Sequence, residues 1–233
     1  MVGKNSFFYH DLKKTFSLLT CFIMKKISPI IEVCATGIET AFAAERSGAG
    51  RVELCRDIEN GGTTPSHAII KYCVNNLKLK TNVLLRPRAG NFVYSDAEFG
   101  IIKNDVSYCK NLGVNAVVVG FLHDDFTVDI EKTTEIVNLA KPMEVTFHRA
   151  FDICVDWEVA LEQIIQCGCT RILTSGQKST AIEGAETLKK IVQQAGNRVI
   201  ILAGSGITME NYKQLVEITG VKEVHGTKLV ISD

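Results

Sequence analysis

A chain of 233 residues, 46% hydrophobic and 22% charged, is long enough to bury one sizeable core and does not require a second domain. Lysine plus arginine equals aspartate plus glutamate at 26 each, so no broad basic surface is expected to attract nucleic acid or anionic lipid. The composition predicts a soluble single domain that has neither nucleic acid nor a membrane as its partner. Eight cysteines scattered through apolar segments of so long a chain are typical of reduced thiols in the cytoplasm.

Residues 1–27 are predicted to form a poorly ordered extension ahead of a folded domain that spans residues 28–233. The apolar run at residues 16–24 has lysines on both sides and is too short to span a bilayer. It resembles the apolar part of a signal peptide, but no small-x-small cleavage site follows it. The extension therefore predicts neither secretion nor a membrane anchor.

From residue 28 onward, short apolar runs alternate with amphipathic segments. The runs predict eight β-strands, at residues 30–34, 51–55, 82–86, 116–120, 145–148, 171–175, 199–203 and 223–227. Apolar residues at three- and four-residue spacing predict helices between them, at residues 38–47, 95–112, 129–140, 157–167, 181–194 and 209–219. Strict alternation of strand and helix implies parallel pairing with right-handed crossovers.

This order of elements predicts an α/β fold of the TIM-like (β/α)8 barrel type. Eight such units in about 200 residues match the lower size limit of that barrel, whereas a doubly wound sheet more often stops at five or six strands. The sequence ends just after the eighth strand, so the final helix is expected to be missing. The seam is then left open, covered by the N-terminal extension, or covered by a partner subunit in a homo-oligomer.

Polar side chains gather at the carboxyl ends of five predicted strands. Because strand side chains alternate, Glu32 lies on the same face as Cys34, and Glu53 lies on the same face as Cys55. Barrel enzymes build their active sites at this end of the strands. The candidate catalytic residues are Glu32, Glu53, Arg86 and His148. The alternative is that these groups only satisfy one another, as an arginine–glutamate network in a wet barrel mouth.

Each of these side chains also has a structural interpretation. His148 suits a direct chemical role, but it could equally be a core histidine bonded to a carboxylate. Arg86 and Arg88 flank a proline that fixes the local backbone, which suits a rigid anion clamp as well as salt bridging at the surface. Glu32 and Glu53 come from adjacent strands, so the charge of one can keep the other protonated for acid–base chemistry. Pairing with the two arginines would explain both glutamates without catalysis.

Two loops at the same end of the barrel predict an anion site. One follows the sixth strand, and the other follows the seventh strand and opens a helix, where backbone amides favour phosphate. The candidate anion-binding residues are Arg88, Ser175, Gly176, Gly204, Ser205 and Gly206. Short glycine–serine motifs are also common in ordinary turns.

The cysteines indicate a different function. Cys34 and Cys55 end neighbouring strands in the same Glu-x-Cys pattern, and strands lie about 4.8 Å apart, near twice a metal–thiolate bond of about 2.3 Å. Two thiolates at that spacing can hold a soft metal, and Cu(I) accepts low coordination by sulfur. The alternative is that both act as small buried hydrophobic residues. Cys167 and Cys169 precede a strand at the opposite end of the barrel and are interpreted as structural.

Several ordered motifs together resemble the CutC copper homeostasis family, over about residues 28–228. They are Glu32-Val33-Cys34, Arg51-Val52-Glu53-Leu54-Cys55, residues 61–66, Arg86-Pro87-Arg88, residues 92–95, residues 146–152, residues 173–176 and Gly204-Ser205-Gly206. The resemblance implies a TIM-like barrel, a cytoplasmic setting and a role in copper handling. It also implies that Cys34 and Cys55 are the Cu(I) ligands, and no organic cofactor is expected.

The sequence departs from the family pattern in two places. The family's Arg-Pro-Arg-Gly-Gly-Asp-Phe has Ala89 and Asn91 here in place of a glycine and the carboxylate, which disfavours metal binding by that loop. After His225 the family usually has a serine, an arginine and a further helix, whereas this sequence has Gly226 and Thr227 and soon ends. Two functions stay open: a Cu(I)-binding homeostasis protein, or a barrel enzyme acting on a small anionic or phosphorylated metabolite by acid–base chemistry.

Overall fold

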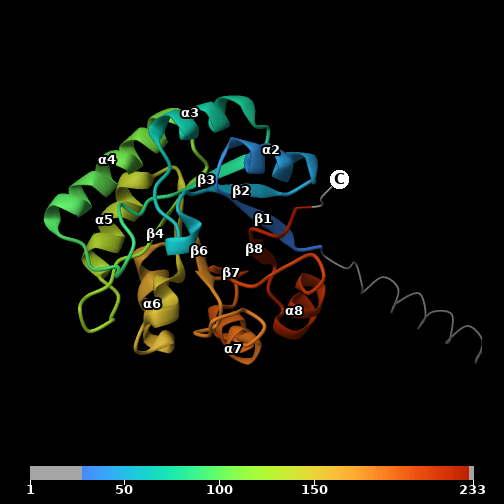
Figure 1. The fold of residues 1–233 in the computed structure, drawn as a ribbon. Helices are drawn as coiled ribbons and strands as arrows, with labels where there is room; N and C mark the ends of the chain where they lie inside the picture. The colour runs from blue at the N-terminus through green and yellow to red at the C-terminus, as the bar shows by residue number, and fades with distance from the viewer. Residues whose placement is uncertain (1–27, 231–233) are drawn as a thin grey trace, which may run out of the picture.

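The computed structural model describes residues 28–230, which form a closed barrel of parallel strands surrounded by helices (Figure 1). The strands are β1 (Ile30–Ala35), β2 (Arg51–Leu54), β3 (Lys80–Leu84), β4 (Ala116–Val119), β5 (Glu144–Phe147), β6 (Arg171–Thr174), β7 (Ile200–Gly204) and β8 (Glu223–Gly226). Each pairs with its neighbour in sequence, and β8 pairs with β1. The predicted α/β barrel is therefore confirmed. The predicted extension at residues 1–27 lies outside the described residues.

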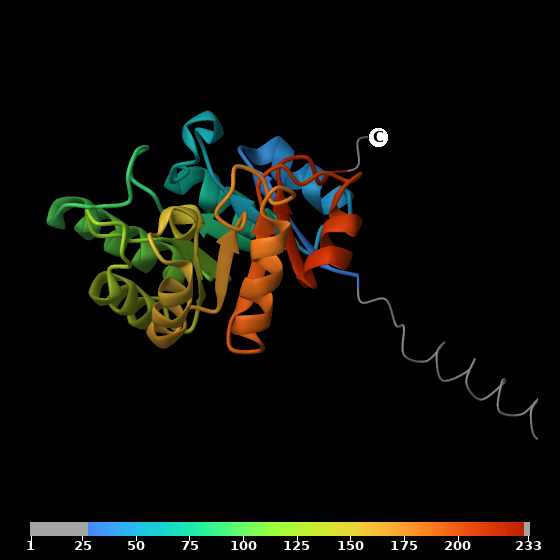
Figure 2. The same ribbon diagram turned by 90° about the horizontal axis from the view of Figure 1, so that it is seen from below.

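Helices cover the outside of the barrel, as the view in Figure 2 also shows. They are α2 (Ile38–Arg46), α3 (His67–Asn76), α4 (Asp96–Leu112), α5 (Ile130–Ala140), α6 (Trp157–Cys167), α7 (Ala185–Ala195) and α8 (Tyr212–Thr219), with two 3-10 turns, η1 (Ile58–Asn60) and η2 (Arg149–Ile153). Among residues 28–230 no helix is long and apolar enough to cross a bilayer.

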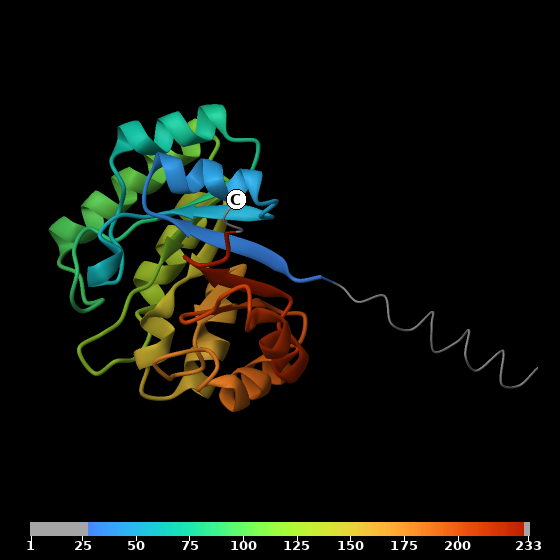
Figure 3. The same cartoon turned by 45° about the vertical axis from the view of Figure 1, so that its right-hand side comes forward.

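The seam between the first and last strands is closed by direct hydrogen bonding. Glu32 of β1 lies beside His225 of β8 in the register, and Ile30 lies beside Glu223. Figure 3 shows the blue β1 and the dark red β8 side by side between α2 and α8. Within the described residues no helix follows β8, as the sequence predicted. The seam is therefore not open at the level of the backbone, which corrects one of the three arrangements considered above.

Helix α3 is not among the helices that apolar spacing predicts, although Pro65 after Thr63 and Thr64 indicates a helix start just before it. Its first turn is capped by Ser66, whose hydroxyl accepts a hydrogen bond from the amide of Ile69 at 3.4 Å. Ile70 and Cys73 are buried on its inner face. Two consecutive isoleucines lower the intrinsic helix propensity of this segment, so burial of one face decides the conformation instead.

Helix α4 carries strong local signals at both ends. At the start of α4, the Ser95 hydroxyl accepts from the Glu98 amide, and the Glu98 carboxylate accepts from the Ser95 amide in return. At its end, Gly113 adopts φ of 77°, in the left-handed region that favours glycine. These end signals fix where α4 meets the loops at the two barrel rims.

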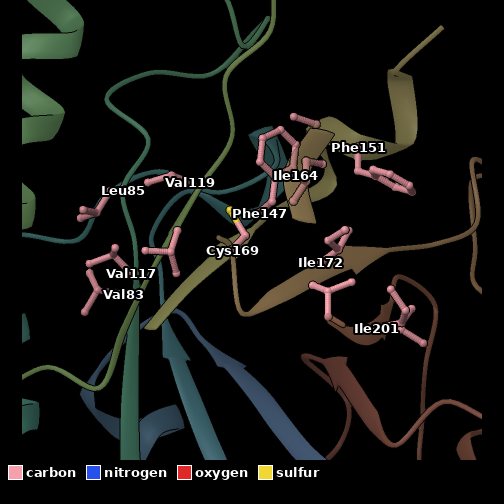
Figure 4. Packing of buried hydrophobic residues seen from close by; sticks show 14 of the residues in the cluster. Val83, Leu85, Val117, Val119, Phe147, Phe151, Ile164, Cys169, Ile172 and Ile201 are labelled. Atoms are coloured by element: carbon pink, nitrogen blue, oxygen red, sulfur yellow. The ribbon is translucent and has the colours of Figure 1, made fainter. Parts of the chain in front are cut away.

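Most of the hydrophobic core lies between the outer faces of the strands and the helices, as Figure 4 shows for Val83, Val117 and Ile172. Cys169 belongs to this core and Cys167 is buried beside it, in agreement with their structural interpretation. The barrel interior has a separate, much smaller apolar cluster, which consists of Cys34, Cys55, Leu84 and Val118. The two predicted metal-ligating cysteines thus belong to the interior of the barrel rather than to the main core.

Candidate functional site

A cavity of about 470 Å³ opens at the carboxyl-terminal mouth of the barrel. Its floor includes the small apolar cluster together with Glu53 and His225, and its upper wall includes His148, Arg86 and the turn at residues 205–208. We refer to this space as the mouth cavity. Its position at the strand ends is the usual one for ligand sites in barrels of this type.

The two floor cysteines are in contact. The sulfurs of Cys34 and Cys55 lie 3.0 Å apart, and one thiol donates a hydrogen bond to the other. In the register Cys34 lies beside Glu53, so Cys55 follows two residues later on the same face of β2. The hydrogen bond with Cys55, burial and the nearby Glu53 charge all raise the pKa of the Cys34 thiol far above its usual range. Cys34 is therefore a protonated thiol at neutral pH.

Glu53 and His225 lie next to this pair. A sulfur, a carboxylate oxygen and a ring nitrogen of Cys34, Glu53 and His225 all lie within 4.8 Å of one another. Burial raises the pKa of Glu53 to about 7, and the charge of Glu32 adds to this effect. Burial lowers the pKa of His225, but the Glu53 charge and the bond to Glu32 outweigh it and raise that pKa to about 9. His225 is therefore a cation at neutral pH.

Glu32, one of the predicted catalytic residues, lies below the cavity floor. It accepts hydrogen bonds from Arg51, from Asn82 at 2.8 Å and from His225 at 2.8 Å. Burial would raise its pKa, but the bonds from His225 and Arg51 prevail and lower the pKa to about 2. Glu32 is thus an ionised, fully bonded group, and it is Arg51 that pairs with it, not Arg86. Its position one inward-facing residue below Cys34 takes it out of the cavity lining.

The network beneath the floor continues across the barrel. Glu223 accepts from Arg51 at 2.5 Å and from Arg171 at 2.7 Å, and Arg171 also donates to Glu144 at 2.9 Å. We call the group of Glu32, Glu223, Arg51, Arg171 and His225 the lower network. An arginine–glutamate network was weighed as the alternative to catalysis, and it exists here, but it is built from different arginines.

His148 lies on the upper wall with one ring nitrogen already used. Its Nδ1 accepts a hydrogen bond from the Ala150 amide at 3.1 Å, so the ring proton is on Nε2. Burial and the charges of Arg86 and Arg149 lower the His148 pKa to about 3, which keeps the ring neutral. Nε2 is buried and has no hydrogen-bond partner among the described residues. The ring fits only because residue 120 is glycine, since a Cβ there would lie 2.4 Å from it.

Arg86 joins two loops rather than pairing with a glutamate. Its guanidinium donates to the carbonyls of Asn60 at 3.1 Å, Gly62 at 2.7 Å and Gly90 at 2.8 Å. It lies 5.0 Å from the centre of the Phe92 ring, and its Nε is buried without a partner among the described residues. Arg86 therefore lines the cavity as a positive charge that no carboxylate of the described chain neutralises directly.

Arg88 does not share this position. It pairs with Glu98 at 2.5 Å and donates to the carbonyl of Val93 at 2.8 Å, away from the cavity. The expectation that Arg86 and Arg88 form one anion clamp is therefore wrong. Strand β3 ends at Leu84, two residues earlier than predicted, so the alternation of strand side chains does not extend through residues 86–88.

The two predicted anion loops differ in their availability. Ser205 and Gly206 line the cavity, both with positive φ, at 78° and 69°. Gly204 ends β7, where a Cβ would lie 2.5 Å from Leu173. The Ser175 amide donates to Asp152, and the Gly176 amide donates to the Thr174 hydroxyl at 2.9 Å. Asp152 thus already occupies the loop after β6, which corrects the prediction that Ser175 and Gly176 hold an external anion.

Three cavity residues were missing from the predicted site. His225 shares a strand face with Thr227, and this alternation is the sequence signal that could have found it. Arg149 directly follows His148 and donates to Asp152 at 2.8 Å and to the Ser175 hydroxyl at 3.0 Å. Lys228 lies at the rim after β8. No sequence pattern singled out Lys228, because it follows the last strand in a segment without regular structure.

The fold and the site together define an α/β barrel protein with a ligand cavity at its mouth and a thiol pair on the cavity floor. The CutC family model matches residues 29–230, and the chain belongs to the CutC family. A CutC family protein of Pasteurella multocida is 43% identical over 195 residues, covering 84% of this chain and 80% of that protein. The mouse copper homeostasis protein cutC homolog is 40% identical, covering 84% of this chain and 72% of that protein.

Solved structures agree with this assignment. A CutC structure from Streptococcus agalactiae superimposes with a TM-score of 0.82 at 33% identity, covering 87% of this chain and all of that one. An aldolase, QR15, superimposes with a TM-score of 0.66 at 15% identity, covering 88% and 92%. The second likeness concerns the barrel fold alone.

Proposed function

We propose that this protein binds Cu(I) through Cys34 and Cys55 and serves copper homeostasis in the cytoplasm. The observation that carries the proposal is the 3.0 Å separation of two buried sulfurs on the floor of an open cavity. Two metal–thiolate bonds of about 2.3 Å each span at most about 4.6 Å, so both sulfurs are within reach of one ion. A reducing compartment keeps such a pair available as thiols.

The chemistry of the donor set favours Cu(I) over a divalent ion. Soft sulfur ligands select Cu(I), whereas structural zinc takes four ligands in a tetrahedron. The neighbouring Glu53 and His225 would have to complete such a set. His225 is protonated and donates to Glu32 at 2.8 Å, so zinc would have to displace that proton and break that bond. Cu(I) held by the two sulfurs leaves His225 and its bond in place, although both thiols release their protons when the ion binds.

A chelator competition experiment tests the proposal. The Cu(I) affinity of the purified, reduced protein is measured against bicinchoninate for wild type and for the double variant Cys34→Ser, Cys55→Ser. We expect the double variant to bind Cu(I) at least about 100-fold more weakly, because two hydroxyls replace two thiolates. Equal affinity in the two proteins would refute the proposal.

Cys154→Ser is the matched control. Cys154 is buried, and its thiol donates to the Ala150 carbonyl at 3.6 Å, a bond that a serine hydroxyl can replace. We expect its Cu(I) affinity to stay within about threefold of wild type. A circular dichroism melt of each variant establishes that the barrel is folded during the measurement.

A further inference from the structure

The mouth cavity is much larger than a metal ion requires. Its volume of about 470 Å³ lies within the range of about 300–1,000 Å³ that is typical of small-molecule sites. The sulfur pair takes up only part of its floor. The remaining wall runs from His148 across to Arg86 and Lys228, and neither Cys34 nor Cys55 is part of it. What this wall could bind is a question separate from copper.

Of the six buried side-chain atoms without a hydrogen-bond partner among the described residues, three belong to side chains that line the cavity. Nearly all buried polar atoms in proteins form hydrogen bonds, so each exception needs an explanation. His148 Nε2, Glu53 Oε2 and Arg86 Nε have no hydrogen-bond partner among the described residues. All three side chains line the cavity, and each residue is only 4% exposed. A bound molecule with polar groups would satisfy them.

The unsatisfied atoms specify the kind of polar group. His148 Nε2 carries the ring proton and must donate. Glu53 Oε2 accepts when the carboxyl is ionised, and the carboxyl donates when it is protonated. A hydroxyl group both accepts and donates, so it suits His148 and it suits Glu53 in either form. The wall therefore matches a hydroxylated molecule better than one that carries only acceptors.

The charges on the wall favour an anion. Arg86, Arg149 and Lys228 line the cavity, and Arg149 is also paired with Asp152 at 2.8 Å. Glu53 is the only carboxylate among the described lining residues. Arg86 is bonded to backbone carbonyls, which leave its charge in place. The depressed pKa of His148 reflects the charges of Arg86 and Arg149, after burial itself. An anionic group near the rim would lie in this positive field.

We propose that the mouth cavity, from Glu53 at its floor up to the rim, is a binding site for a small hydroxylated anion, either a hydroxy acid or a polyol phosphate. Its hydroxyl groups contact His148 and Glu53, and its anionic group lies toward Arg149 and Lys228. The site goes beyond Cu(I) binding and does not depend on it, because neither Cys34 nor Cys55 takes part.

Isothermal titration calorimetry with defined probes tests the site. Glycerol 3-phosphate and glycerate represent the phosphate and the carboxylate source of the same chemistry. Glycerol has the hydroxyl groups but no anionic group, and inorganic phosphate has the anionic group but no polyol hydroxyls. We expect at least one of the first two probes to bind with a Kd of about 1 mM or tighter, and each half-probe to bind at least tenfold more weakly.

Two variants locate the binding. His148→Asn keeps an acceptor for the Ala150 amide but removes the Nε2 donor, so we expect the fold to persist and the affinity to fall at least tenfold. Lys228→Gln removes a rim charge and should weaken binding about three- to tenfold. Lys222→Gln is the matched control, because Lys222 is exposed beside the first residue of β8, at the opposite end of the barrel. It should bind like wild type.

Three results would each overturn the proposal. One is that neither glycerol 3-phosphate nor glycerate binds to wild type. Another is that inorganic phosphate binds as tightly as glycerol 3-phosphate, which would remove the hydroxyl requirement. The third is unchanged affinity in both His148→Asn and Lys228→Gln, with melting temperatures showing that both variants are folded. Binding that persists in the Cys34→Ser, Cys55→Ser variant would separate this site from the copper site.

Discussion

The lower network and the mouth cavity are stacked in one barrel interior, yet they treat buried charge in opposite ways. In the lower network every charged side chain has a partner of opposite sign, and Glu223 alone accepts from two arginines. In the cavity, the terminal nitrogens of the Arg86 guanidinium donate to backbone carbonyls and to no carboxylate. Glu53 and His148 each have one buried polar atom without a hydrogen-bond partner among the described residues.

The difference separates a structural from a ligand-binding role for the same residue types. A buried ion that loses a partner of opposite charge is strongly destabilised, so the paired charges of the lower network hold the barrel together. An unpaired buried polar group lowers the stability of the free protein. That stability is regained when a ligand forms a hydrogen bond with the group. Residue type alone would have grouped Glu32 with Glu53, but their surroundings place them on opposite sides of this division.

The largest expected effect comes from breaking the lower network. Glu223→Gln removes the negative charge between Arg51 and Arg171, both of which are buried. We expect the free energy of unfolding to fall by about 3 kcal/mol, and the melting temperature by roughly 10 °C. Urea and thermal unfolding followed by circular dichroism measure both. A loss below about 1 kcal/mol would contradict a structural role for the network.

The pH dependence of stability tests how the Glu53 charge and the bond to Glu32 hold the His225 proton. The folded-state pKa of His225, about 9, lies above its ordinary value of 6.5. The folded state therefore holds this proton more tightly, so its contribution is fully present below pH 6.5 and is lost as pH rises through 9. The loss is on the order of 3 kcal/mol for a shift of that size.

Urea unfolding at several pH values between 7.5 and 9.5 measures this slope. His225→Gln keeps an N–H donor for Glu32 but cannot titrate, so the slope should disappear in the variant. The window lies above the pKa of Glu53, about 7, which limits interference from that group. An equal slope in wild type and variant would assign the effect to another residue.

In the cavity, a glutamate-to-glutamine substitution should raise the free energy of unfolding, whereas in the lower network it lowers it. Burial raises the pKa of Glu53 from 4.5 to about 7, so its ionised form destabilises the folded state above pH 7. Glu53→Gln cannot ionise, and we expect a gain of about 1 kcal/mol in the free energy of unfolding at pH 8. At pH 4.5 the gain should largely vanish. A loss comparable to that of Glu223→Gln would abolish the contrast between the two regions.

Most of the fold could be predicted because buried parallel strands and amphipathic helices have clear periodicities. All eight strands occur where apolar runs predicted them, although β3 lies at Lys80–Leu84 rather than at residues 82–86. For helix α3 only the start near Pro65 carried a sequence signal, because its isoleucine pair disfavours a helix locally. Strand ends depend on tertiary hydrogen bonds, so no local signal fixes them to the residue.

The candidate site could be predicted only in part. The contact of Cys34 with Cys55 follows from one repeated pattern on two neighbouring parallel strands, which is information the sequence carries. The depth of Glu32 depends on the stagger of the strands around the barrel, which no single segment encodes. Arg88 was misplaced because the strand ended early.

The smallest expected effect is at the surface. An ion pair there has bidentate geometry, yet its loss should change the stability less than the loss of a pair inside the barrel. Arg198 donates to both oxygens of Glu162, at 2.6 and 2.8 Å, and with Gln194 lowers the pKa of Glu162 to about 2. A depressed carboxyl pKa contributes stability above about pH 4.5 that is lost as pH falls through 2. Water and salt screen this exposed pair, so Arg198→Gln should leave the melting temperature at pH 7 within about 2 °C of wild type. If Arg198→Gln lowered the melting temperature as much as Glu223→Gln does, burial could not be the reason that the lower network stabilises the barrel.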